Sequence, residues 1–83
     1  MLKDLTSGNS VSGAKQSRRA IRDGLAQAVY LARDADPALT DPLRALCREK
    51  DVPVIDGCAM RELGQAAGIA VGAAVVTLLK PRI

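Results

Sequence analysis

The 83-residue chain contains no histidine, and its two cysteines, Cys47 and Cys58, are not spaced as a CxxC motif. The usual zinc sites, which need four Cys or His ligands, are therefore excluded. A nucleophilic cysteine also needs a neighbouring general base, usually histidine. Asp34 and Asp36 could act as paired carboxylates, but two acids before a proline are more typical of turns and helix caps. We expect no metal, no cofactor and no enzymatic activity.

Aromatic residues are almost absent: there is no tryptophan or phenylalanine, and Tyr30 is the single tyrosine. Proteins that bind extended single-stranded nucleic acid stack bases on aromatic side chains, so this class is excluded. With 48% hydrophobic and 25% charged residues, the composition is nevertheless that of a folded protein. The length suits one domain, residues 1–83, with a core built from Ala, Val, Leu and Ile.

Long hydrophobic runs are missing as well. The first ten residues lack the apolar core of a secretion signal. The uncharged segment 63–79 is shorter than the roughly 20 residues that cross a bilayer. We predict instead that this segment contains the end of a helix, a loop at 68–72 and a buried strand. We expect a cytoplasmic protein with free thiols, no membrane contact and a monomeric state.

Apolar runs alternate with amphipathic runs along the chain, which is typical of layered α/β folds. We predict helices at 14–23, 42–50 and 59–67, and strands at 10–12, 28–32, 52–55 and 73–79. Gly24 would end the first helix. Asp41 would cap the second helix at Pro42, or a preliminary turn could begin at Pro37 or Leu39. The pattern predicts a four-stranded sheet with helices on both faces.

Acidic residues are absent between Leu5 and Arg22, where basic residues concentrate. Offsets of three, four and seven place these bases on one face of the first predicted helix: Lys15, Arg18, Arg19 and Arg22. Ala20, Ile21 and Leu25 would face the sheet. Many charged helix faces serve only solubility, but a concentrated basic face also attracts polyanions.

The start of this helix adds features that suit a nucleic acid. Gly13 allows close backbone approach, and the first N–H groups of a helix suit a phosphate. Lys15 and the arginines could contact phosphates, while the amide of Gln16 could donate to and accept from a base edge. A folded RNA with an opened groove fits this pattern better than a DNA major groove.

Five blocks in order, VSGAKQSRRAI, AVYLARDADP, LCREKDVPV, ELGQAAGI and VGAAVV, resemble the L7Ae/L30e/S12e/Gadd45 family of ribosomal proteins, especially its small bacterial members. The likeness covers about residues 11–79. It implies an α/β/α sandwich around a four-stranded mixed sheet. It also implies binding to kink-turns, bent RNA motifs with sheared guanine–adenine pairs beside a three-nucleotide bulge, in ribosomal or riboswitch-like RNA, with the ribosome as a further partner.

The resemblance also implies roles for single residues. Gly13 would begin the recognition helix, Lys15 and Gln16 would read the guanines, and Arg19 would support them. Asp36 would meet the flipped-out bulge base. The loop 69–73 would pack on the bulge. The complete set of expected RNA-binding residues is Gly13, Lys15, Gln16, Arg18, Arg19, Arg22, Asp36, Ile69, Val71, Gly72 and Ala73.

Within the loop 69–73, Ile69 could equally be a buried residue of a helix-to-strand turn, whereas Val71 and Gly72 are expected to contact RNA. Gly72 stands where many relatives have proline, which predicts a more mobile loop. Arg33 replaces an acid of similar blocks and makes this edge more basic. Ala59 replaces a serine helix cap, a loss of about 1 kcal/mol unless Asp56 or Cys58 substitutes.

A second hypothesis is a protein-interaction module on the same fold with weak or lost RNA binding, as in the Gadd45 branch. That function would favour an acidic helix face and a lost Lys-Gln pair. The sequence keeps Lys15, Gln16 and a basic face, so RNA binding is the preferred hypothesis.

Overall fold

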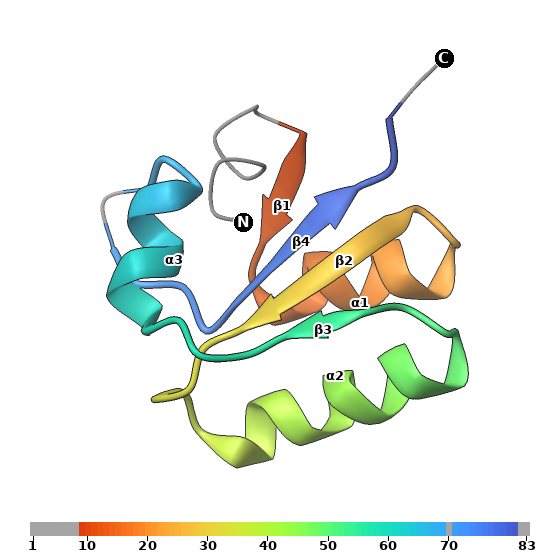
Figure 1. Cartoon of the computed structure of the whole chain (residues 1–83), viewed down its shortest axis with the longest axis horizontal. Helices are drawn as coiled ribbons and strands as arrows, with labels where there is room; N and C mark the ends of the chain where they lie inside the picture. Colours follow the sequence, from red (N-terminus) through yellow and green to blue (C-terminus); the bar gives the residue numbers. More distant parts are fainter. Residues whose placement is uncertain (1–8, 70, 82–83) are drawn as a thin grey trace.

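The computed structural model describes residues 9–69 and 71–81, which form three helices and a four-stranded sheet (Figure 1). The helices are α1 (Ala14–Arg22), α2 (Pro37–Glu49) and α3 (Met60–Ala66). The strands are β1 (Ser10–Ser12), β2 (Ala26–Leu31), β3 (Val54–Ile55) and β4 (Val75–Leu79). The order in the sheet is β1-β4-β2-β3; β4 runs antiparallel to both neighbours, and β3 runs parallel to β2. The sheet is therefore mixed, and the predicted α/β/α sandwich is confirmed.

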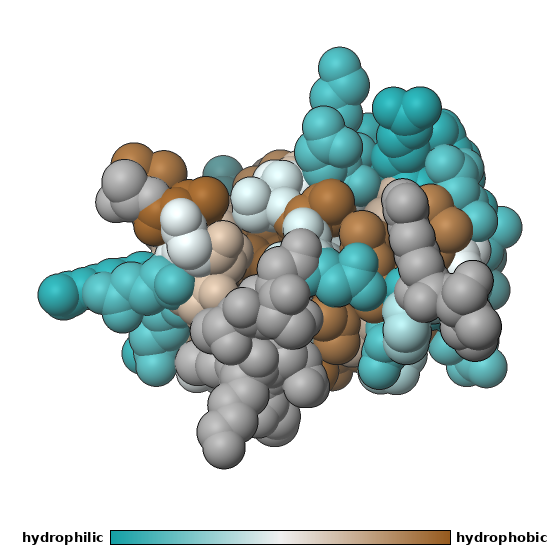
Figure 2. Space-filling model, turned by 90° about the horizontal axis from the view of Figure 1, so that it is seen from above, coloured by the Kyte–Doolittle hydropathy of each residue, from teal (hydrophilic) through white to brown (hydrophobic). Residues whose placement is uncertain are grey.

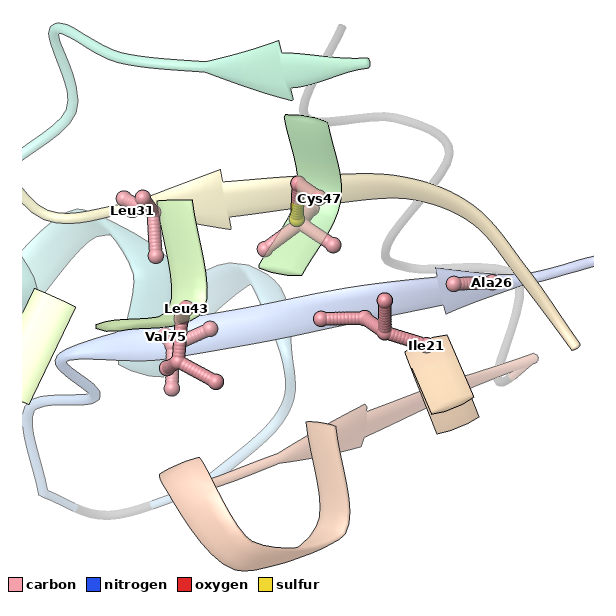
Figure 3. Packing of buried hydrophobic residues seen from close by; sticks show 7 residues of the cluster. Ile21, Ala26, Leu31, Leu43, Cys47 and Val75 are labelled. Atoms are coloured by element: carbon pink, nitrogen blue, oxygen red, sulfur yellow. The ribbon is translucent and has the colours of Figure 1, made fainter. Parts of the chain in front are cut away.

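Each face of the sheet has its own hydrophobic cluster, because side chains alternate along a strand. Helices α1 and α2 cover one face, where Ile21, Leu43 and Cys47 lie over strands β2 and β4 (Figure 3). Helix α3 covers the other face, where Leu63 packs with Tyr30. Apart from Tyr30 and Cys47, the buried hydrophobic residues described are aliphatic, as the composition predicted.

Helix α2 begins at Pro37 and not at Pro42, which lies inside the helix. Its cap is Asp36, whose carboxylate accepts a hydrogen bond from the N–H of Ala38 (3.0 Å), and not Asp41. The Asp-Pro pair occurs twice in the sequence, and either copy could start a helix. The first copy does so, and Pro42 inside the helix then removes one intrahelical hydrogen bond without preventing the helix from forming.

Three predicted strands differ from the observed strands at their starts. Strand β2 begins at Ala26, followed by a register shift before Ala28. Strand β3 is shorter than expected, since the N–H of Val52 donates to the carbonyl of Cys47 (2.8 Å) and closes helix α2 instead. Strand β4 begins later, since the N–H of Ala73 donates to a carbonyl of α3. For β3 and β4, a neighbouring helix therefore takes a backbone hydrogen bond that the predicted strand would have used.

The prediction that Leu25 faces the sheet is wrong, because its side chain is 54% exposed. Gly24 ends α1 with φ +75°, and the N–H of Leu25 then donates to the carbonyl of Ala20 (2.9 Å). This is the hydrogen-bond pattern of a Schellman motif. It turns the chain away from the helix axis and leaves the Leu25 side chain in solvent, while Ala20 and Ile21 are buried as expected.

Three segments meet at one end of the sheet, where β4 begins. The N–H of Gly13, just before α1, donates to the carbonyl of Val75 (3.0 Å). The N–H of Ala32, just after β2, donates to the carbonyl of Ala74 (2.9 Å). The start of α1, the β2–α2 loop and the α3–β4 loop are therefore neighbours, although they are far apart in sequence.

Candidate nucleic-acid interface

The start of helix α1 has no side-chain cap. Gly13 occupies the cap position with φ +94°, a conformation that favours glycine and provides no side-chain acceptor. Its carbonyl accepts from the N–H of Ser17 (3.0 Å). The N–H groups of the first helical residues have no intrahelical acceptor, so this end of the helix can donate to an anion.

The predicted basic face of α1 is exposed. Its residues line a shallow depression: Lys15, Gln16, Arg18, Arg19 and Arg22. Among the described residues only Arg22 of these forms an ion pair, with Asp23 at 3.7 Å, and both side chains are largely solvated. On the opposite side of the helix, Ser17 is buried against the sheet with Ala20. The positive charge of the face is therefore available to a polyanion.

The α3–β4 loop, whose last residues adjoin the start of α1, presents one large apolar side chain to solvent. Val71 is 71% exposed, and apolar atoms reach the surface near the end of the molecule that carries α3 (Figure 2). Gly72 is also exposed. Ile69 is half-buried against the cluster under α3, and Ala73 is 6% exposed. Val71 and Gly72 are thus accessible, whereas Ala73 supports the loop from below; position 70 lies outside the described residues.

The two acids of the β2–α2 loop both cap helices. Asp36 caps α2, and Asp34 Oδ1 accepts a hydrogen bond from the N–H of Met60 (2.8 Å), the first residue of α3. The loop thus uses its carboxylates separately, as the turn-and-cap interpretation predicted. The loop that carries Asp36 begins where Ala32 binds Ala74 near the start of β4, and a contact of Asp36 with RNA stays a prediction.

The lost serine cap of α3 is replaced in a way that the sequence did not indicate. Asp34, 26 positions from Met60, supplies the acceptor. Glu62 Oε1 accepts from the N–H of Ala59 (2.8 Å), and this hydrogen bond, helped by Arg33, lowers the pKa of Glu62. Neither predicted substitute serves: no capping bond from Cys58 is present among the described residues, and Asp56 is engaged elsewhere.

Asp56 binds Arg44 of α2 through two hydrogen bonds of 2.8 and 2.9 Å. The hydrogen bond from Arg44 lowers the pKa of Asp56, and the same bond raises the pKa of Arg44. Arg33 is likewise partly neutralised, since its Nη1 donates to the carbonyl of Gly57 (2.8 Å) and lies 3.3 Å from Glu62 Oε1. Arg33 therefore adds less free positive charge to this edge than the sequence suggested.

Two polar residues of α3, Arg61 and Gln65, lie beside the α3–β4 loop but are not among the RNA-binding residues expected from the sequence. A depression beside the loop is lined by Asp34, Met60, Arg61, Gln65, Ile69, Val71 and Gly72. Arg61 and Gln65 are four residues apart and therefore share a face of the helix. That spacing was visible in the sequence, but which way the face points depends on how α3 is seated.

The described residues offer few features of other protein classes. In 9–69 and 71–81, no helix combines the length and apolarity that crossing a membrane requires. Over the same ranges, no three metal-binding side chains come together. Both cysteines are free thiols: Cys47 is buried, which raises its pKa, and Cys58 is half-buried.

Comparison with known proteins shows which family and which relatives this chain is similar to. Residues 2–82 match the Ribosomal protein L7Ae/L30e/S12e/Gadd45 family. RNA-binding protein YbxF of Geobacillus stearothermophilus and an RNA-binding protein of Geobacillus sp. (strain WCH70) are each 41% identical over 78 residues, which cover 94% of this chain and 95% of each relative. The Giardia lamblia 15.5kD RNA binding protein superimposes with a TM-score of 0.89 at 27% identity, covering 96% of this chain and 71% of that chain.

Proposed function

Because the chain belongs to the ribosomal protein L7Ae/L30e/S12e/Gadd45 family, we propose that it binds structured RNA and recognises kink-turns. Binding would favour the bent conformer of the RNA over its extended alternatives, without any covalent chemistry. Ribosomal RNA and riboswitch-like RNA in the cytoplasm are the proposed targets. The RNA-binding relatives support the general function, and the residues of the site support the specific one.

One observation carries the proposal: the uncapped start of α1, with Lys15 and Gln16 exposed in its first turn, lies beside the loop that exposes Val71. A kink-turn offers matching groups, namely phosphates, the guanine edges of sheared pairs and an extruded base. Gln16 can contact a base edge, and Lys15 a guanine or a phosphate. Val71 can pack on the bulge, and the remaining bases of α1 can neutralise phosphates of the stems.

The decisive test is a titration against a short RNA with one kink-turn and against a control RNA whose two guanine–adenine pairs are replaced by Watson–Crick pairs. We expect tight binding to the first RNA and weak, salt-sensitive binding to the second. Gln16→Ala should lower affinity for the kink-turn by roughly 1–3 kcal/mol, the usual worth of a base contact. Gln27→Ala, an exposed glutamine at the other end of the sheet, is the matched control and should bind like wild type.

Equal affinity for both RNAs would reduce the basic face to a nonspecific polyanion patch and contradict the proposal. A change of affinity in Gln27→Ala equal to that in Gln16→Ala would contradict the assignment of base reading to α1. Absence of RNA binding at low salt, with capture of a protein partner that survives nuclease, would favour the interaction module instead.

A further inference from the structure

Helix α3 and the loop that it precedes approach each other so closely that one position admits no side chain. Gly64 is buried in α3 with a backbone conformation open to any residue. A methyl group at Gly64 would overlap the carbonyl oxygen of Val71 and come within 3.1 Å of the Gly72 Cα. These neighbours are backbone atoms, so the clash can be relieved only if the loop or the helix moves.

Hydrogen bonds hold the loop on the helix at both of its ends. The N–H of Ile69 donates to the carbonyl of Gly64 (3.0 Å), and the N–H of Ala73 donates to the carbonyl of Met60 (3.0 Å). Gly72 lies against the same residue, since a methyl group there would be 3.2 Å from the Met60 Cβ. Helix α3 is therefore the platform, that is, the surface against which the loop packs. The position and exposure of Val71 depend on this packing.

The platform is itself tied to the second loop at this end of the sheet. Asp34 lies in the β2–α2 loop, yet its carboxylate accepts from the first N–H of α3 at Met60 (2.8 Å). The loop that carries Asp36 and the loop that carries Val71 are thus linked through one carboxylate and one short helix.

We propose that Gly64 and Asp34 are positioning residues for RNA recognition: they set where Val71 stands relative to α1 without touching RNA themselves. This inference rests on the proposed function, because it concerns the same surface. It assigns a role in specificity to two residues outside the set expected from the sequence. The affinity for the bulge side of a kink-turn should therefore depend on a glycine buried in α3.

The first test is Gly64→Ala, measured by affinity for the kink-turn RNA. We expect a loss of about tenfold, the size of a coupling between residues in contact. Val71→Ala should also lose affinity, and the double variant should lose less than the sum of the two single effects, because a displaced Val71 no longer contributes. Additive losses would show that Gly64 does not act through Val71 and would overturn the inference.

Loss of stability alone must be separated from loss of position. Cys47→Ala, which removes a buried side chain on the opposite face of the sheet, is the control: it should lower the unfolding temperature and leave RNA affinity unchanged. If Cys47→Ala and Gly64→Ala lost affinity in proportion to lost stability, the effect would be structural and the inference wrong.

Asp34 provides a second test with a conservative rescue. Asp34→Asn keeps an oxygen that can accept from the N–H of Met60, whereas Asp34→Ala does not. We expect the alanine variant to lose affinity and the asparagine variant to retain most of it. Equal losses in both variants would assign the effect to the charge and not to the cap, and would exclude a positioning role.

A readout without RNA separates this inference from the proposed function. Amide chemical shifts of residues 71–73 in the free protein should change in Gly64→Ala and Asp34→Ala and stay close to wild type in Asp34→Asn. If the wild-type protein bound no kink-turn but these shifts changed in the variants as expected, the proposed function would be wrong, while the packing of the loop on α3 through Gly64 and Asp34 would be supported. Unmoved shifts would overturn the seating whatever the RNA result.

Discussion

Helices α1 and α2 pack side by side on one face of the sheet, but they begin and use their charges differently. Helix α2 starts at a capped terminus, where Asp36 satisfies the N–H of Ala38, and its Arg44 is bound to Asp56. Helix α1 starts at Gly13 without a side-chain cap, and most of its bases lack an acidic partner among the described residues. In α2, side chains of the protein satisfy a first-turn N–H group and the charge of Arg44. In α1, the first N–H groups and most of the positive charges have no such side-chain partner among the described residues.

The uncapped start and the basic face of α1 lower the stability of the protein. Glycine in place of Ser or Asp at a cap costs only about a few tenths of a kcal/mol, but four bases on one helix face also repel each other. The cap residue of α2, Asp36, has ordinary extended backbone, whereas the φ of +94° at Gly13 favours glycine and leaves α1 without a side-chain acceptor. The donors and positive charge of α1 that the chain does not use are available to an anionic ligand.

The largest expected effect comes from Lys15→Glu, which gives the start of α1 the acid that it lacks. An acid in the first turn interacts favourably with the helix dipole, so stability should rise by about 0.3–1 kcal/mol. Affinity for kink-turn RNA should fall by at least about tenfold, since a contact with the RNA becomes a repulsion. Urea unfolding and RNA titration of the same preparation measure both changes.

The matched control for Lys15→Glu is Lys50→Glu, the same reversal at the carboxyl end of α2. There the acid meets the unfavourable end of the dipole, so stability should fall slightly while RNA affinity stays near wild type. If Lys15→Glu lost stability and affinity together, the start of α1 would be a structural element like that of α2, and the comparison would fail.

The next effect is smaller and concerns the capped helix. Asp36→Ala removes the acceptor for the N–H of Ala38 and should cost about 1 kcal/mol of stability, within a usual range of about 0.5–2 kcal/mol. Asp36→Asn should retain most of the stability, since asparagine also caps. A second readout, affinity for an RNA with and without the bulge base, decides whether Asp36 also contacts that base: a selective loss in Asp36→Asn would support it.

Most of the fold could be predicted from the sequence because its signals are local. The strand at 10–12, the helix that Gly24 ends and the four-stranded sheet all follow from periodicity and glycine positions. The start of α2 was ambiguous for a physical reason: Asp36-Pro37 and Asp41-Pro42 carry the same cap signal. The structure uses the first copy, and no local signal distinguishes it from the second.

The site was predictable only in part. Lys15 and Gln16 lie on a short helix whose exposed face follows from spacing, so their exposure was expected. The cap of α3 by Asp34 and the close approach of Gly64 to Val71 are contacts between a loop and helix α3. No local rule connects positions 26 residues apart, so these contacts required the three-dimensional structure.

The smallest expected effect tests the charge pairing that separates α2 from α1. The hydrogen bond from Arg44 lowers the pKa of Asp56 in the folded state, so the pair stabilises the protein above the unfolded pKa of about 4. This stability is lost as the pH falls through the lower, folded pKa. Because the pair is well exposed, its contribution should stay below about 1 kcal/mol.

Asp56→Asn should therefore lose stability at pH 7 but show a smaller drop in unfolding free energy than wild type between pH 7 and pH 3, measured by urea unfolding. Glu49→Gln, which changes an exposed acid at the end of α2, is the control. An equal pH dependence in both variants would show that the Arg44–Asp56 pair contributes nothing to holding α2 in place.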